Sequence, residues 1–366
     1  MKKVTDIQLK KQPSTISFFI ISCLMYFTNQ SAAAPLNIYF GDIHGHSTFS
    51  DGCGDPYDYY QNAINNELDF AALTDHGEQL SYEEWEAIKN LTATYNSPGN
   101  FVTFFGYEWT HSKYGHKVVL FRRIPIGFYP SLLKSSGQTP KDLWSSLNRL
   151  GFYDKAITIP HHPAGGPVTT SWNYHDDNYQ PIVELVSKHG NSEFSVNDYT
   201  IPDSERFEQI DYYFKNNGRD HSVKYAHRIL GYKLGVIGGT DTHDADPGSV
   251  YSDEICQSLH TYQGGLTAVL AEKLSKEHIW HALKARRVYA TSGPKILLHF
   301  RIGESLMGET VEVTGAPKLS IKAVAPAGYT IDKIVIEKNS RTVQKITGDA
   351  LKDGTTSWRD LKFSDD

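Results

Sequence analysis

The chain alternates short apolar runs with segments of helical pattern, and this alternation constrains its fold more than any other feature. Each run ends in polar residues, and Pro, Gly or Ser stands at many of the boundaries. Strands are predicted over residues 37–42, 68–73, 101–105, 117–121, 156–159, 182–186 and 234–237. Helices are predicted over residues 57–67, 82–95, 141–150 and 222–230. Strands that alternate with helices favour a parallel sheet or a β/α barrel, so the fold class is α/β.

The pattern changes after Gly293 and Pro294, beyond a last predicted helix at residues 276–287. Leu319, Ile321 and Ala323 alternate with polar residues, which is typical of a strand with one buried face. We therefore expect a barrel over residues 35–293 and a small antiparallel β-module over residues 294–366.

The first 34 residues have the layout of a secretory signal peptide. Four lysines precede an apolar stretch at residues 16–27, and small residues follow at 31–34. The stretch is too short to cross a bilayer comfortably, so no stable membrane span is expected after cleavage. A lipoprotein cleavage box at Cys23 is disfavoured, because the apolar residues 24–27 would then begin the mature protein. The expected location is secreted or periplasmic.

The net charge of −6 over 366 residues argues against a nucleic-acid partner, because such proteins need a basic face. The net charge is compatible with a small-molecule substrate. Cys53 and Cys256 would remain after cleavage, and we treat both as incidental, because two distant cysteines do not by themselves establish a disulfide.

Histidines and carboxylates stand just after most of the predicted strands. His44 and His46 are two residues apart at the end of the first strand, so both side chains point the same way. A β/α barrel gathers the carboxyl ends of its strands at one face, where such residues would meet. Imidazole and carboxylate groups are ligands for transition metals. The further candidate ligands are Asp51, His76, Glu108, His116, His161, Asp241 and His243.

These motifs together resemble the PHP superfamily, the polymerase and histidinol phosphatase domains, over residues 37 to about 250. The resemblance rests on Asp42-Ile43-His44-Gly45-His46-Ser47, Ser50-Asp51-Gly52, Thr74-Asp75-His76, Gly106-Tyr107-Glu108 and Asp241-Thr242-His243. The segments 183–193 and 285–293 further resemble an uncharacterised exported bacterial branch of that superfamily. The resemblance implies a distorted (β/α)7 barrel that holds divalent metal ions, Zn, Mn or Fe, about two or three per chain.

The resemblance also implies how the ligands would be shared. The first metal would take His44, His46, Glu108 and Asp241. The second would share Glu108 and add His116 and His161, and the third would take Asp51, His76 and His243. Asp75 and His162 would orient the ligand side chains without binding a metal themselves. His162 is also an alternative to its neighbour His161 as the metal ligand.

The function implied is that of an exported hydrolase in which a metal-bridging hydroxide attacks a phosphate ester. His189 or His243 would assist proton transfer. Lys188, His189, Asn191 and Glu193 follow the sixth strand and could face the metals, and Arg122 could bind an anionic oxygen or lie in solvent.

Two alternatives to the phosphoesterase remain open. The ligand cluster by itself supports hydrolysis of a non-phosphate ester, a lactone or an amide equally well. The protein could instead be an exported binding protein whose metals are structural. A structural zinc site is normally closed with four ligands, so about nine candidate ligands favour an open, multinuclear centre.

Overall fold

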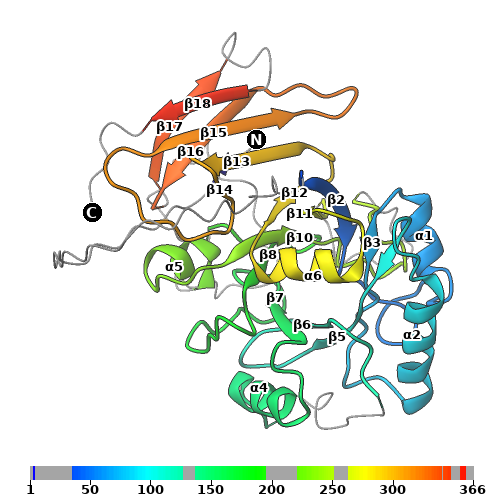
Figure 1. Ribbon diagram of the computed structural model, residues 1–366. Helices are drawn as coiled ribbons and strands as arrows, with labels where there is room; N and C mark the ends of the chain where they lie inside the picture. Colours follow the sequence, from blue (N-terminus) through cyan, green and yellow to red (C-terminus); the bar gives the residue numbers. More distant parts are fainter. Residues whose placement is uncertain are drawn as a thin grey trace, which may run out of the picture.

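The computed structural model describes residues 3–4, 35–126, 137–194, 221–250, 263–339, 341–347 and 355–359. These residues form a mixed α/β fold (Figure 1). The described helices are α1 (Tyr59–Asn65), α2 (Tyr82–Tyr95), α4 (Pro140–Arg149), α5 (Val223–Arg228) and α6 (Lys276–Lys284). The predicted signal segment lies outside the described residues, apart from β1 (Lys3–Val4).

Helix α2 begins and ends where the sequence predicts, because its start carries a strong local signal. The Ser81 hydroxyl accepts a hydrogen bond from the Glu84 amide, and the Glu84 carboxylate accepts one from the Ser81 amide. This capping box satisfies two amides that have no partner within the helix. Thr139 and Asp142 form the same arrangement at the start of α4.

One five-stranded sheet carries the first cluster of site residues. Its strand order is β12-β11-β2-β3-β4, formed by β2 (Asn37–Asp42), β3 (Phe70–Ala71), β4 (Val102–Thr103), β11 (Leu266–Ala271) and β12 (Val288–Thr291). Strands β2, β3 and β4 run parallel, as the alternating pattern predicts. Strands β11 and β12 were not predicted, and β11 pairs with β2 in the antiparallel sense.

Two smaller sheets carry the remaining site residues. Strands β5 (Phe105–Trp109), β6 (Lys117–Phe121) and β7 (Ala156–Pro160) form one of them. Its pairings are antiparallel, so the expectation of parallel strands throughout was wrong here. The other sheet has the order β10-β8-β9, with β8 (Ile182–Ser187), β9 (Gly190–Asn191) and β10 (Gly235–Gly238), and β8 and β10 run parallel.

Isolated backbone bridges join neighbouring sheets at the site. Gly45 pairs with Thr242, and His76 pairs with Glu108, each in the parallel sense. The sheets of the described residues nevertheless remain separate and do not close into one hydrogen-bonded barrel. The (β/α)7 barrel therefore stays a prediction, whereas the mixed α/β class is confirmed.

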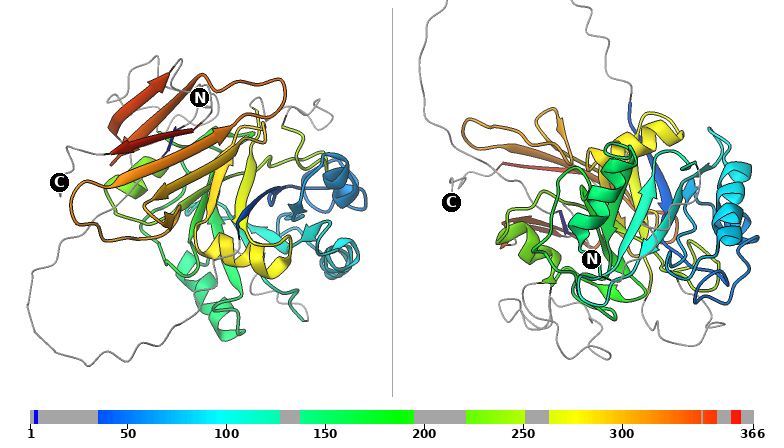
Figure 2. Two further views of the ribbon diagram at one scale, coloured as in Figure 1. Left: turned by 45° about the horizontal axis from the view of Figure 1, so that its top comes forward. Right: turned by 90° about the horizontal axis from the view of Figure 1, so that it is seen from below.

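The C-terminal residues form strands, as the alternating pattern predicts. Strands β13 (Leu297–Ile302), β14 (Ser305–Leu306), β15 (Lys318–Val324) and β18 (Thr355–Arg359) make an antiparallel sheet. Strands β16 (Lys333–Lys338) and β17 (Arg341–Thr347) pair with each other, and β1 adds to β16. Phe300, Ile321, Ile334 and Ile346 belong to one apolar core that joins both sheets. Figure 2 shows the strands of these two sheets together at one end of the molecule.

Candidate metal centre

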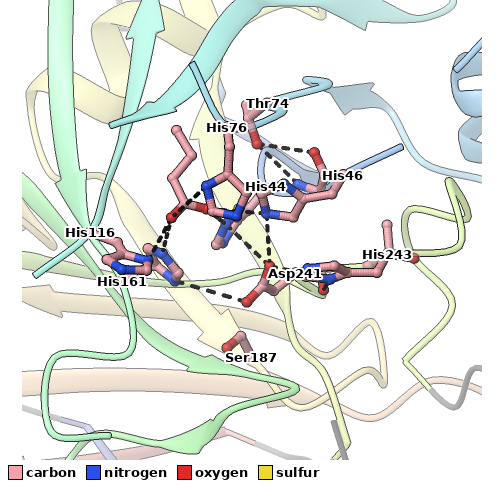
Figure 3. Close-up of polar contacts among 12 residues, drawn as sticks. His44, His46, Thr74, His76, His116, His161, Ser187, Asp241 and His243 are labelled. Atoms are coloured by element: carbon pink, nitrogen blue, oxygen red, sulfur yellow. Dashed lines mark hydrogen bonds and ion pairs between the residues drawn. The ribbon is translucent and has the colours of Figure 1, made fainter. Parts of the chain in front are cut away.

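Glu108 lies at the centre of the site, near the end of β5, and is 1% exposed. Its Oε2 atom is 3.2 Å from Nε2 of His44 and 3.1 Å from Nε2 of His46. Its Oε1 atom is 2.8 Å from Nδ1 of His116 and 3.1 Å from Nε2 of His161. One carboxylate thus faces two separate pairs of imidazoles, and Figure 3 shows the four histidines grouped with Asp241.

Asp241 completes the first group of donor atoms. Its Oδ1 atom lies 3.3 Å from Nε2 of His44 and 3.1 Å from Nε2 of His46. Its backbone has a φ of 56°, in the left-handed region that a residue with a side chain seldom adopts. The donor atoms of His44, His46, Glu108 and Asp241 lie within 4.8 Å of one another, and all four residues are buried.

The charges of this group suit a divalent cation. Burial by itself would raise the pKa of Glu108, but the nearby His76 imidazole and hydrogen bonds from His116 and His161 hold it well below its ordinary value. Burial would likewise lower the pKa of His46, but hydrogen bonds to Asp241 and Glu108 raise it to about 10. The carboxylates therefore attract positive charge, which protons on the imidazoles supply in the metal-free protein. A cation would replace these protons on binding, since imidazole binds metals in its neutral form.

A second group contains His116, His161 and His162. All three are buried, and one ring nitrogen of each lies within 4.8 Å of one ring nitrogen of the others. The ring centroids of His161 and His162 are 3.8 Å apart. Burial lowers the pKa of His161 to about 3 and that of His162 well below its ordinary value, so both imidazoles are neutral and able to donate a lone pair.

The predicted third set also comes together, at a more open position. The Asp51 carboxylate, 46% exposed, lies 3.3 Å from Nε2 of His76 and 3.5 Å from Nε2 of His243. The donor atoms of His46, Asp51 and His76 lie within 4.8 Å of one another. The Nδ1 atom of His76 is 2.6 Å from the Thr110 hydroxyl, which fixes the orientation of that ring.

Asp75 organises the loop that carries Asp51. Its carboxylate accepts hydrogen bonds from the amide of Ser47 at 2.8 Å, from the hydroxyl of Ser47 at 2.8 Å and from the hydroxyl of Ser50 at 2.6 Å. These hydrogen bonds hold the backbone between His46 and Asp51 in its conformation.

Glu184 is a site residue that sequence reasoning missed. It lies in β8, is 2% exposed, and its Oε2 atom is 2.9 Å from Nδ1 of His44. Burial raises the pKa of Glu184 to about 7 against the opposing effect of His44. The only signal in the sequence is an acidic residue inside an otherwise apolar strand, between Val183 and Leu185.

The residues predicted to bind substrate are divided between the site and other places. His189 is at the site, with its Nε2 atom 3.1 Å from Oδ2 of Asp241. Lys188 is buried beside it, where desolvation lowers its pKa, and its amide donates to the Thr240 carbonyl. The Asn191 side chain instead accepts a hydrogen bond from the Glu193 amide at 2.8 Å.

Arg122 is not brought to the site, and its predicted contact with substrate was wrong. Strand β6 runs antiparallel to β5, so His116 stands at the site end of β6 and Arg122 follows the opposite end. Six residues of extended chain, at about 3.4 Å each, place the two roughly 20 Å apart. Arg122 forms an ion pair there with Glu277 of α6, with a distance of 2.8 Å from its Nε atom.

Cys53 is disulfide-bonded, so its treatment as an incidental cysteine was wrong. Cys23 and Cys256 both lie outside the described residues. None of the helices in the described part of the chain combines the length and apolar character that a bilayer crossing requires.

Curated proteins similar to this chain occur in Chlamydia. The chain is 26% identical over 330 residues to an uncharacterized protein of Chlamydia pneumoniae and 25% identical over 325 residues to one of Chlamydia trachomatis. Each match covers 86% of this chain and 48% of the relative, so the chain spans about half the length of these proteins.

Solved structures resemble the chain at low sequence identity. A two-domain protein of Bacteroides vulgatus, containing a predicted PHP-like metal-dependent phosphoesterase, is 15% identical with a TM-score of 0.45, over 88% of this chain and 85% of that one. PsfC from Pseudomonas syringae is 15% identical with a TM-score of 0.41, over 70% of this chain and 91% of that one. A family model, "Protein of unknown function (DUF3604)", matches residues 62–255 and 249–357. Because these matches cover more than half of its length, the chain belongs to the DUF3604 family.

Proposed function

We propose that the protein is a metal-dependent hydrolase of phosphate esters with a centre of two or three divalent cations, Zn, Mn or Fe. The observation that carries this proposal is the position of Glu108, whose two carboxylate oxygens face different pairs of imidazoles. A carboxylate placed in this way can bridge two cations, as in two-metal hydrolases where the ions lie about 3.5–4 Å apart. The fold proposed is the PHP-type distorted barrel over residues 35–293, with a β-module over residues 294–366.

The ligands proposed follow the three groups of donor atoms. The first cation would be held by His44, His46, Glu108 and Asp241, the second by Glu108, His116 and His161, and the third by Asp51, His76 and His243. When bound, these cations would supply Lewis-acid activation of water and of the phosphoryl oxygens. The buried carboxylates hold the imidazole rings in place before substrate arrives.

We propose that His189, or His243 where the third position holds no cation, carries protons at the edge of the centre. His189 is 13% and His243 15% exposed, so both reach the solvent side, whereas His44 and His46 do not. Asp241 accepts from Nε2 of His189 through the oxygen that does not face His44 and His46. We propose that His189 transfers a proton to the leaving oxygen and that Lys188 beside it binds a phosphoryl oxygen.

Metal analysis of the purified protein, together with a substrate panel, tests this function. We expect about two or three divalent cations per chain, because the Glu108 carboxylate would be shared between two of them. We also expect hydrolysis of phosphomonoesters or phosphodiesters that a chelator abolishes and added Zn²⁺ or Mn²⁺ restores. If the protein hydrolyses only carboxylesters, lactones or amides, the phosphoesterase proposal fails and the protein is a metal-dependent hydrolase of non-phosphate substrates. Bound metal without turnover of any class would indicate a binding protein.

Glu184 is expected to set the metal affinity of the first position without binding the metal. Its contact with Nδ1 of His44 fixes the tautomer that leaves Nε2 free as a donor. Loss of such a partner typically weakens metal binding about 10–100-fold. Glu184→Ala should show this loss in a competition titration against a chelator, and Glu184→Gln, which retains an acceptor oxygen, should show a smaller one. Equal affinities in both variants and the wild type would contradict this role.

Export to the periplasm or the medium is part of the proposal. Disulfides persist in oxidising compartments, so the bonded state of Cys53 supports it beside the signal-like N-terminal segment. Cell fractionation of the full chain, with and without residues 1–34, tests the location.

A further inference from the structure

His162 is a buried imidazole that the proposed ligand sets leave unused. The residue is 3% exposed. Among the described residues, neither of its ring nitrogens meets a hydrogen-bond partner. A polar group buried without a partner is unfavourable, and native proteins keep such groups where a ligand or an ion satisfies them.

The backbone around His162 is held in an uncommon conformation. His162 has a φ of 34° and Gly166 a φ of 67°, both in the left-handed region. A Cβ atom at Gly166 would lie 2.3 Å from Nδ1 of His162, so only glycine leaves room for the ring. That Cβ would also lie 2.4 Å from Cγ and 2.6 Å from Cε1, so Gly166 packs on one face of the ring and fixes its orientation. Strain of this kind is typical of functional positions.

The neighbours of His162 are two of the proposed ligands of the second cation. Its ring centroid is 3.8 Å from that of His161 and 4.9 Å from that of His116. One donor nitrogen on each of the three rings lies within 4.8 Å of the others. His116 and His161 both also contact Oε1 of Glu108, at 2.8 Å and 3.1 Å.

We propose that His162 is a third imidazole ligand at the second position, where it binds one divalent cation together with His116, His161 and Glu108. The three imidazoles, with Oε1 of Glu108 beside two of them, would supply four donors of the types that zinc prefers. A position closed by four protein donors holds its cation tightly and leaves little room for water or substrate. The first position also has four protein donors, so the most open coordination sites would belong to the third position, which has three donors and lies beside the exposed carboxylate of Asp51. This inference rests on the proposed metal centre and deepens it.

Metal titration of the full chain tests the assignment. The cations are removed with a chelator, and Co²⁺ or Zn²⁺ is returned to the wild type and to His162→Asn. Asparagine tolerates a positive φ, so this variant is compatible with the local backbone. We expect one of the bound cations to lose at least about tenfold in affinity. The Co²⁺ absorption of a tetrahedral site should weaken at the same time, and the remaining cations should bind as before.

His175→Asn is the matched control. His175 stacks on Tyr232 with ring centroids 4.0 Å apart and pairs with Asp177, outside the donor groups, so its metal titration should equal that of the wild type. Thermal unfolding of both metal-free variants reports whether they fold. Unchanged affinity, stoichiometry and Co²⁺ spectrum in folded His162→Asn would overturn the assignment, even if turnover fell. If the wild type binds metal as described and hydrolyses nothing, the hydrolase proposal fails while this inference stands.

Discussion

Glu108→Gln is expected to lose at least two of the bound cations and to lower the rate of phosphate-ester hydrolysis by about a thousandfold or more. The substitution removes the charge that faces His44 and His46 through one oxygen and His116 and His161 through the other. A thousandfold loss corresponds to about 4 kcal/mol of transition-state stabilisation, which is within what bound cations supply. The measurement is metal content by mass spectrometry beside kcat/KM for the best phosphate ester.

Glu86→Gln serves as the control for this experiment. Glu86 pairs with Lys89 on the surface of α2 and contacts none of the described donor groups, so metal content and turnover should match the wild type. Because glutamine has nearly the same shape as glutamate, the Glu108 variant should fold, and its thermal unfolding without metal verifies this. A folded Glu108→Gln protein with full metal content and full activity would refute the bridging role.

Much of the site could be predicted from the sequence because its residues occupy strand ends. The pair His44 and His46 follows β2, whose bounds the sequence pattern predicts correctly. Asp241 and His243 follow β10 in the same way. When strands lie side by side in a sheet, residues at corresponding ends meet whatever their separation in the chain. The structure brings these motifs together as expected, although which cation each residue holds remains a proposal.

The errors arise where local sequence pattern carries no information about pairing. An apolar run predicts a strand but does not distinguish a parallel from an antiparallel partner, so the hairpin of β5 and β6 was missed. That error placed Arg122 at the wrong end of its strand. Glu184 escaped notice for another reason, since its role depends on the contact with His44, 140 residues away in sequence. No spacing rule reports such a contact.

The attachment of the C-terminal sheets is a second feature that the sequence did not reveal. Lys224 of α5 lies 3.3 Å from the Glu193 carboxylate and 2.9 Å from that of Glu337 in β16. All three residues are less than 10% exposed. The pairing of β16 with β17 shifts between Ile336 and Glu337, and such bulges redirect a side chain. Glu193 was predicted to face the metals, but the structure directs it into this ion pair, a few residues beyond His189.

Lys224→Met is expected to destabilise the protein by about 3 kcal/mol or more, because it removes the cation that pairs with the buried carboxylates of Glu193 and Glu337, and breaking a buried ion pair costs about 3–5 kcal/mol. The Lys224 ammonium is the group that joins Glu193 to Glu337, and it also lies 4.0 Å from the centre of the Phe194 ring. Urea unfolding with fixed metal content measures the loss. The matched substitution Lys113→Met removes an exposed lysine that lies over Tyr114 and should change stability by less than about 0.5 kcal/mol. Equal unfolding midpoints for the two variants would show that the ion pair between Lys224 and these carboxylates does not stabilise the contact of β16 with the loop after His189.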